Sequence, residues 1–313
     1  MEYLSDNKIL KYNPNTLVEL RKVYNLDKPG QMDEAIDLLD AWVKKQSHFV
    51  RKDFRKEYLE RVIILMKGSV ERAKGQLDKI STLRTLLPNF FEKCDTKNDL
   101  KIIRGLAYSV LLPKLTNDNI RVLFCKFAPA KYTPKIFLDI YRSNILISEY
   151  LKAHDYSKGI AIVLDIRDMN ILDFVSQLNL IEMKQICTII LEGYDTRAQN
   201  FLFLSSSKAI DVLIKIFKQM ISEKLGKRVH VLKEVEELYQ FIPKELLPSE
   251  YGGNEKTLSE MNDDTVEELS SEDNVKYFRE MSKVCTIESL RTSSKYNEDF
   301  SGIAGTFRTL SVD

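Results

Sequence analysis

Long apolar runs are absent from this sequence. No stretch approaches the eighteen or so uncharged apolar residues that a membrane-spanning helix requires. The first ten residues also lack the basic segment followed by an apolar segment that is typical of a secretory signal. We therefore expect a cytoplasmic protein whose contact with membranes, if any, is peripheral.

Paired cysteines are also missing. The four cysteines, Cys94, Cys125, Cys187 and Cys285, are scattered without a C-x-x-C pair. Such spacing favours reduced thiols over a disulfide framework or a zinc site. We expect no metal.

The motifs of nucleotide-binding and hydrolytic enzymes are absent as well. A doubly wound sheet that binds a nucleotide needs a glycine-rich turn after a strand, and the expected strand ends at residues 128–130, 165–168 and 205–207 contain no glycine. No G-x-S-x-G, H-E-x-x-H or G-K-[ST] motif occurs. This pattern argues against an enzyme.

Single residues with catalytic potential have simpler interpretations. The histidines His48, His154 and His230 fall in separate segments, and His230 lies on an expected strand, where a buried structural histidine is the more common case. Ser205 to Ser207 precede a helix and are expected to cap it. Asp165 ends an apolar strand, where an α/β enzyme would place a carboxylate, but it has no histidine near it in the sequence.

Net charge is small, at +1, which argues against a nucleic-acid partner bound through a broad basic face. Residues 255–273 nevertheless hold eight acids and one lysine, a local charge of −7, so the remainder carries +8. The acidic stretch reads as a solvated linker, and the positive excess elsewhere favours contact with an anionic membrane surface.

Hydrophobic periodicity predicts an α/β protein. Residues 1–95 show the three–four spacing of several short amphipathic helices. Strands are then expected at residues 120–127, 159–165, 201–204 and 228–232, with helices between them at residues 134–152, 175–192 and 208–225. Strands that alternate with helices predict a largely parallel sheet.

The helix expected at residues 208–225 is apolar around most of its circumference. A helix of this kind must bury both sides, in core, ligand or membrane. Basic residues gather near its end, namely Lys224, Lys227, Arg228 and Lys233, and Arg197 precedes the strand before it. Their position beside surplus apolar surface makes an anionic lipid contact as good an interpretation as a merely solvated corner.

These segments resemble the CRAL-TRIO family of lipid-binding proteins, which includes the tocopherol and retinaldehyde carriers. Residues 241–253 (FIPKELLPSEYGG) are similar to the closing motif of the family, and residues 159–165 are similar to its central strand. Residues 222–230 match the end of its lid helix and the next strand. Weaker similarity to arthropod members lies at residues 42–46, 81–88 and 302–313.

The resemblance implies an N-terminal helical domain at residues 1–97, a CRAL-TRIO lipid-binding domain at 98–253, and an acidic, polar extension at 254–313. The domain would hold one hydrophobic molecule, a tocopherol, a retinoid or another lipid, with no further cofactor, in a monomeric protein. The implied lining is Tyr141, Asn144, Ile145, Ser148, Ile160, Leu164, Ile186, Ile189, Ile190, Phe201 and Phe203.

The family also implies a gate and a docking site. The gate would carry Ile210, Leu213, Ile214, Phe217 and Met220 on its inner face. Phosphoinositide binding would fall on Arg197, Lys224, Lys227 and Arg228. The implied function is transfer of the lipid between membranes, and the alternatives are a lipid-sensing adaptor that retains its ligand or an enzyme acting on a lipid.

Two positions depart from the family pattern. Ile64 stands where relatives carry an arginine, which puts a basic membrane contact from the N-terminal domain in question. Ser205 and Ser207 replace the asparagine and proline that usually precede the gate, so its hinge is expected to move differently.

Overall fold

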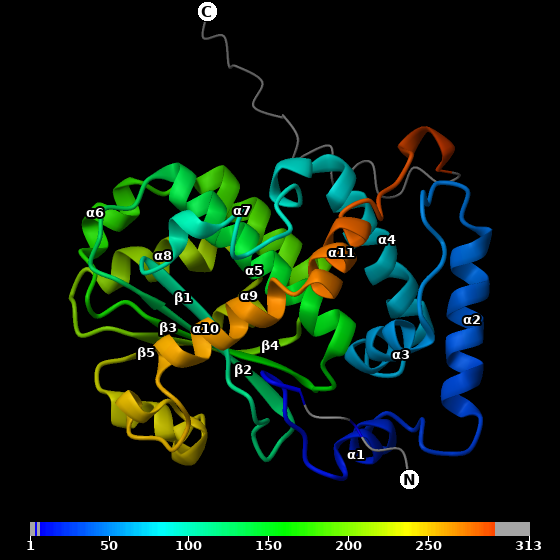
Figure 1. Ribbon diagram of the computed structural model, residues 1–313, viewed down its shortest axis with the longest axis horizontal. Helices are drawn as coiled ribbons and strands as arrows, with labels where there is room; N and C mark the ends of the chain where they lie inside the picture. The colour runs from blue at the N-terminus through cyan, green and yellow to red at the C-terminus, as the bar shows by residue number, and fades with distance from the viewer. Residues whose placement is uncertain (1–3, 5–6, 292–313) are drawn as a thin grey trace, which may run out of the picture.

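The computed structural model describes residue 4 and residues 7–291. A five-stranded sheet lies at its centre, with helices packed around it (Figure 1). The strands lie in chain order: β1 (Ala107–Leu111), β2 (Ile120–Phe127), β3 (Gly159–Asp165), β4 (Ala198–Leu204) and β5 (Val229–Leu232). From β2 to β5 the pairing is parallel, as predicted, whereas β1 pairs antiparallel with β2 and was not predicted.

The two faces of the sheet bury different sets of side chains. Residues alternate across a strand, so Ala161 and Val163 of β3 pack against Leu202 of β4 and Tyr251 of the closing motif. Ile162 and the other even-numbered residues of β3 face the opposite side, toward the helices. This explains why β3 is apolar without interruption: both of its faces are covered.

Helices α5 (Pro134–His154), α6 (Ile171–Ser176), α7 (Leu180–Thr188) and α8 (Ile210–Met220) contribute to the core on that second side. A π-helical turn, Ile189–Gly193, continues α7. The predicted helix at 175–192 is therefore too long at its start, because Asn179 accepts hydrogen bonds from the backbone N–H groups of Ile181 and Glu182 and begins α7 there.

The helix predicted at residues 208–225 is two helices. Ile221 adopts an extended conformation (φ −123°, ψ 165°), which ends α8 at Met220. Ser222 then caps α9 (Glu223–Gly226) by accepting a hydrogen bond from the backbone N–H of Leu225. The apolar helix is thus shorter, and the basic residues stand on a separate turn.

The N-terminal helices occur where they were predicted: α1 (Thr16–Val23), α2 (Gln31–Lys45), α3 (Lys56–Leu65) and α4 (Val70–Leu86). Ser69 caps α4 through the N–H of Arg72. Short 3₁₀ turns occur between and after these elements, at Pro88–Phe90, Lys101–Ile103, Val235–Gln240, Lys244–Leu246, Ser249–Tyr251 and Glu288–Leu290.

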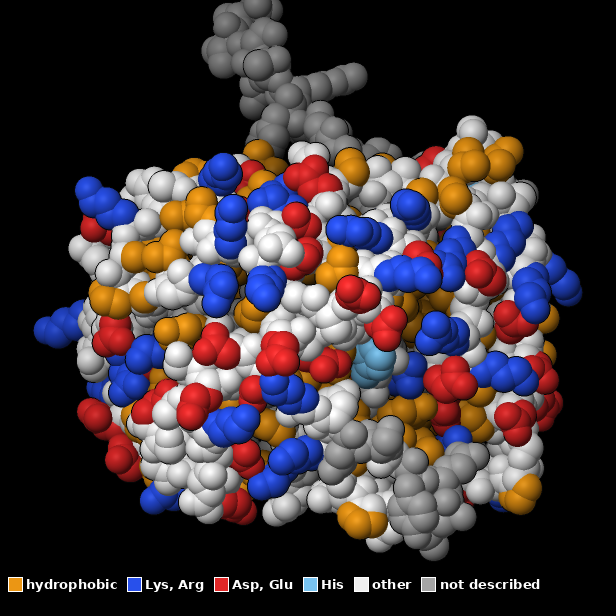
Figure 2. All heavy atoms as spheres, in the orientation of Figure 1, with side chains coloured by type: hydrophobic (Ala, Val, Ile, Leu, Met, Phe, Trp, Pro, Cys, Tyr) orange, Lys and Arg blue, Asp and Glu red, His pale blue; other side chains and the backbone are white. Residues whose placement is uncertain are grey.

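The acidic stretch is mostly helical rather than a solvated linker. It forms α10 (Leu258–Leu269), which contacts β1 and α5, and is followed by α11 (Glu272–Met281). Lys8 pairs with Asp264 at 3.1 Å and with Glu267 at 2.5 Å, which offsets part of the negative charge. Charged side chains of both signs are interspersed over the face that these helices cross (Figure 2).

Within the described residues, no helix combines the length and the apolarity that crossing a membrane requires. The motif similarity at residues 302–313 lies outside the described residues. The domain boundaries at 97/98 and 253/254 stay predictions.

Candidate functional site

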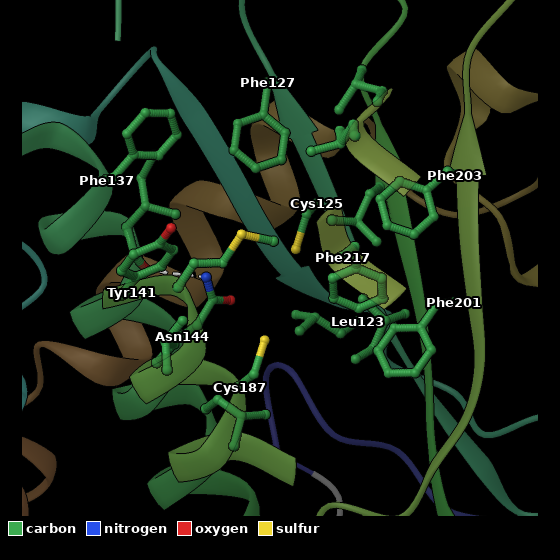
Figure 3. Close-up of a pocket in the computed structure, with 18 of the residues that line it drawn as sticks. Leu123, Cys125, Phe127, Phe137, Tyr141, Asn144, Cys187, Phe201, Phe203 and Phe217 are labelled. Atoms are coloured by element: carbon green, nitrogen blue, oxygen red, sulfur yellow. Dashed lines mark hydrogen bonds between the residues drawn. The ribbon is translucent and has the colours of Figure 1, made fainter. Parts of the chain in front are cut away.

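An apolar cavity of about 210 Å³ lies between the sheet and helices α5, α7 and α8. Figure 3 shows Tyr141 and Asn144 of α5 on one side and Phe201, Phe203 and Leu123 of the strands on the other. Most of its lining is hydrocarbon or aromatic. Such a site accommodates a hydrophobic molecule rather than a charged one over most of its length.

Secondary-structure period directs these side chains inward. On α5, Phe137, Tyr141, Asn144 and Ser148 recur every three or four residues and so share one face of the helix. On the strands, every second residue faces the cavity, as for Phe201 and Phe203 of β4.

The cavity gathers most, but not all, of the predicted lining. Its walls include Tyr141, Asn144, Ser148, Leu164, Ile186, Ile190, Phe201 and Phe203. Ile145 and Ile189 instead pack against Ile80 and Leu83 of α4. Ile145 follows Asn144 directly, so its position is rotated by about a quarter-turn around α5, away from the cavity.

Ile160 lies on the cavity side of β3 but beyond the end of the cavity, where it lines a second, much smaller one. Its register explains this, since Ile160 pairs with Arg121 of β2, two residues before Leu123, which lines the main cavity.

From α8, Leu213 and Phe217 face the cavity. The ring of Phe217 meets Phe201 at 5.1 Å and Phe203 at 5.4 Å between ring centroids, edge to face in both cases. Ile210 and Ile214 are buried in the adjoining core and Met220 is half-buried at the end of the helix, so these three predicted gate residues do not line the cavity.

An aromatic group that the sequence did not reveal closes one end of the cavity. Phe174 of α6 packs against Phe137 at 4.8 Å and Phe127 at 5.8 Å, and Tyr132 joins them. The sequence signal for Phe127 was present, because it continues the alternation of β2. Phe174 lies on a helix of only six residues, too short to show periodicity.

Burial keeps the ionisable groups of the cavity neutral. It raises the pKa of Cys125 to about 11 and that of Cys187 to about 12, and it raises the pKa of the Tyr141 phenol as well. Neutral thiols are poor nucleophiles. The cavity therefore presents hydrogen-bonding groups but no activated nucleophile.

The other candidates for catalysis have structural partners. Asp165 accepts hydrogen bonds from Tyr251 Oη at 2.5 Å and from Arg167 at 2.8 and 3.0 Å, on the sheet face opposite the cavity. Burial alone would raise the pKa of Asp165, but the hydrogen bonds from Arg167 and Tyr251 lower it. His230 packs its ring against Phe241 at 4.7 Å.

The serines before α8 form turn hydrogen bonds. Ser205 Oγ accepts from the N–H of Ser207 at 3.3 Å, and Ser207 Oγ accepts from the N–H of Ala209 at 3.2 Å. Within residues 7–291, no cluster of three histidine, cysteine or acidic side chains is arranged to hold a metal.

Basic side chains gather outside the cavity, beside the strand ends. Arg197 Nη1 donates to Tyr24 Oη at 2.5 Å, and Arg228 Nη1 donates to the carbonyl of Ala198 at 2.5 Å. Arg197, followed by burial and by Lys224, Arg72 and Arg228, lowers the pKa of Lys67. We call these five residues, Lys67, Arg72, Arg197, Lys224 and Arg228, the basic cluster.

Two members of the basic cluster come from the N-terminal region: Lys67 lies in the turn between α3 and α4, and Arg72 lies on α4. The chain therefore places cations there although Ile64 is buried and not basic. Lys227, predicted as part of the same site, pairs with Glu223 at 3.0 Å.

The parallel sheet, the apolar cavity and the helix that covers it define a class of α/β proteins built around a hydrophobic cavity. Residues 108–253 match the family model of the CRAL/TRIO domain. These residues form a CRAL-TRIO domain, and the proteins of the CRAL-TRIO family bind and transfer lipids.

Two known proteins to which the chain is similar share little sequence identity with it. The chain is 22% identical over 264 residues to the mouse alpha-tocopherol transfer protein-like protein, covering 83% of this chain and 76% of that one. It is similar in fold to the crystal structure of Sfh5, with a TM-score of 0.50, 13% identity, and coverage of 87% of this chain and 99% of the other.

Proposed function

We propose that the protein carries one hydrophobic lipid in the α8-covered cavity and transfers it between membranes. One observation supports this proposal above all: α8 covers the apolar cavity, and its Phe217 packs on Phe201 and Phe203 of β4. The position of α8 over the cavity, through Leu213 and Phe217, is suited to a gate.

The cavity volume of about 210 Å³ favours a gate that moves. Sites for small molecules usually measure about 300–1,000 Å³. A lipid with a long tail therefore needs α8 to shift outward, both to enter and to remain bound.

The energetics of burial indicate that the protein controls the barrier to lipid exchange rather than the equilibrium. Each buried methylene contributes about 0.8 kcal/mol, so a tail of a dozen carbons gains on the order of 10 kcal/mol in the cavity. A bilayer offers the tail a similar gain. The free energies of the lipid in the protein and in the bilayer are thus nearly equal. The protein acts by lowering the barrier between them, because the tail does not have to cross water.

The surface near the gate fits contact with a membrane. Exposed apolar side chains lie on α8 and on the two helices that it contacts, α6 and α7: Leu172, Leu180, Ile181 and Val212. Hydrophobic side chains appear among basic ones over this region at the left of Figure 2. Together with the basic cluster, they would hold the gate against anionic headgroups such as phosphoinositides.

Cross-linking α8 to α7 tests the gate. Lys184 Nζ donates to the carbonyl of Met220 at 3.0 Å, so Lys184→Cys and Met220→Cys, in a background without the native cysteines, suit a short bifunctional thiol reagent with a cleavable bond. Transfer of a fluorescent lipid between vesicles should stop when the link is made and return when it is cleaved. Unchanged transfer in the linked protein would refute the gate.

A protein that binds lipid but never exchanges it would instead favour the lipid-sensing adaptor. That outcome is visible in the same assay, because lipid would stay with the protein before and after cleavage of the link.

Charge reversal tests the docking surface. Replacing Arg197, Lys224 and Arg228 with glutamate should abolish binding to phosphoinositide vesicles, and added salt should weaken wild-type binding. The control reverses three exposed lysines elsewhere, Lys45, Lys101 and Lys276. Uptake of lipid from detergent reports that the fold is intact, and equal vesicle binding by both triple variants would contradict the docking site.

A further inference from the structure

A second cavity of about 20 Å³ adjoins the main one along α5. Ser148 lines both cavities, and Lys152, one helical turn further along the same face, lines the smaller one. The polar side chains Asn144, Ser148 and Lys152 therefore form a stripe that runs from the apolar cavity to its small neighbour.

Lys152 is unusual because its ammonium group is buried without a hydrogen bond. The residue is 1% exposed, and its Nζ makes no hydrogen bond within the part of the chain that the structure describes. A buried amine without a partner costs free energy. Burial lowers the pKa of Lys152 to about 8, while Asp195 and Glu149 act in the opposite direction, so the group stays mostly protonated at neutral pH.

Apart from Asp195, the acids near Lys152 are already paired with other groups. Arg121 and Asp155, which line the same small cavity, form a salt bridge at 2.7 Å. Glu149 pairs with Arg84 at 2.5 Å and also accepts hydrogen bonds from Tyr194 and Tyr277. The small cavity therefore carries a surplus positive charge, at the polar end of a hydrophobic hollow.

We propose that the protein's lipid is an acid, a long-chain carboxylate whose head binds Lys152 Nζ beside Ser148 and whose tail fills the apolar cavity. The proposal rests on the proposed function, since it requires that a lipid enters the cavity. A carboxylate supplies the charge-assisted hydrogen bond that the ammonium lacks. A cavity of about 20 Å³ holds one water, and the head displaces that water.

A structural role for Lys152 is the competing explanation. In that case the lysine balances the charge of Asp195 through the protein interior, and the lipid head is neutral. The pKa of Asp195 is raised by burial, against the effects of Lys152 and Arg197, so this carboxyl is an incomplete counter-ion.

Binding of three lipids with one tail distinguishes the two explanations. Oleic acid, its methyl ester and oleyl alcohol are titrated against wild type, Lys152→Met and Asp195→Asn, with displacement of a fluorescent lipid as the signal. A charge-assisted hydrogen bond predicts that wild type prefers the acid to the ester by ~10-fold or more. Lys152→Met should lose this preference and bind the acid no more tightly than the ester, because a buried carboxylate without a cation is destabilised, whereas Asp195→Asn should keep the preference.

Each other result overturns the inference. Equal wild-type affinity for acid and ester would mean that Lys152 does not bind the carboxylate of the lipid. A preference for the acid that survives in Lys152→Met would place the carboxylate elsewhere. If wild type binds the ester and the alcohol but not the acid, the proposed function stands and this inference fails. If none of the three displaces the fluorescent lipid, this inference fails while the bound fluorescent lipid still supports the proposed function, and if the fluorescent lipid itself does not bind, both fail.

Discussion

Single residues decide which polar atoms the cavity presents. Tyr141, Asn144 and Ser148 were predictable from the resemblance, and the structure brings all three to the cavity wall. Lys152 was not predicted, because a lysine in the last turn of a helix normally points to solvent and complements the helix dipole. Here α11 and the N-terminal helices cover the end of α5, and sequence alone does not show that cover.

Replacing Lys152 with methionine should stabilise the unliganded protein at neutral pH. Lowering of the pKa from 10.5 to about 8 corresponds to about 3 kcal/mol of destabilisation, as an upper estimate. The unfolded chain binds more protons than the folded one between pH 8 and 10.5, so wild-type stability rises with pH in that window. The penalty is complete below pH 8.

Urea unfolding of both proteins at pH 7 and pH 10 measures the effect. The variant should be the more stable at pH 7, and its advantage should shrink at pH 10. Lys45→Met, at an exposed site, should change little at either pH. A Lys152→Met protein less stable than wild type at pH 7 would show that the ammonium has a stabilising partner.

Helices and strands differ in how much the sequence told about them. The four parallel strands and their crossover helices were predictable, because apolar runs of strand length alternate with longer amphipathic ones. The break at Ile221 was not, although Ser222 is a recognisable cap, because apolar periodicity continues through it. β1 was missed because Ala107 and Ser109 leave it without a continuous apolar run.

The facing of a helix is harder to predict than its existence. Asn144 lines the cavity and Ile145 packs on α4, although an apolar residue is the more natural choice for an apolar wall. The sheet packs on one side of α5, and the N-terminal helices pack on another. Which residues of α5 face which neighbour depends on tertiary packing between distant parts of the chain, and the local sequence does not report that packing.

Gly253, the last residue of the closing motif, lies in a tight turn that has no room for a side chain. A Cβ at Gly253 would overlap the carbonyl oxygen of Leu247, which belongs to rigid backbone. The segment carries Tyr251, whose hydroxyl holds Asp165 at the end of β3. Gly253→Ala should therefore lower the free energy of unfolding by ~3 kcal/mol or more, or abolish folding.

Gly226→Ala is the matched control. Its nearest new contact is Lys218 Cγ at 4.0 Å, and it lies in α9, where alanine is favoured over glycine by about 1 kcal/mol. Thermal unfolding should show a neutral or raised midpoint for Gly226→Ala and a large drop for Gly253→Ala. Similar midpoints for the two would contradict the tight turn.

At the scale of the whole molecule, the C-terminal segment packs on the N-terminal helices. Ile287 N–H donates to the carbonyl of His48 at 2.8 Å, and Val50 N–H donates to that of Cys285 at 3.0 Å. Met281 and Val284 share a core with α2 and α3. A polar, acidic composition predicted an extension loosely joined to the rest, and composition does not report a few well-placed apolar side chains.

Arg291 joins the C-terminal segment to α4. It donates to Asp78 at 2.7 and 2.9 Å and to Thr82, joining residues more than two hundred positions apart, and the side chains of Arg291 and Asp78 are only 3% and 8% exposed. Arg291→Ala leaves Asp78 with His48 as its neighbour. Breaking a buried pair from one side costs about 3–5 kcal/mol. We expect a loss near the lower end.

Lys256→Ala provides the comparison, because that lysine pairs with Asp264 at 2.6 Å while 58% exposed, and such pairs contribute about 0–1 kcal/mol. Urea unfolding should shift to lower midpoint for Arg291→Ala with an unchanged slope, since the segment unfolds together with the N-terminal helices. The Asp78→Ala, Arg291→Ala double variant should lose less than the sum of its single changes. If Arg291→Ala instead matches Lys256→Ala, the C-terminal segment unfolds independently, and the boundary predicted at residue 254 separates a true appendage.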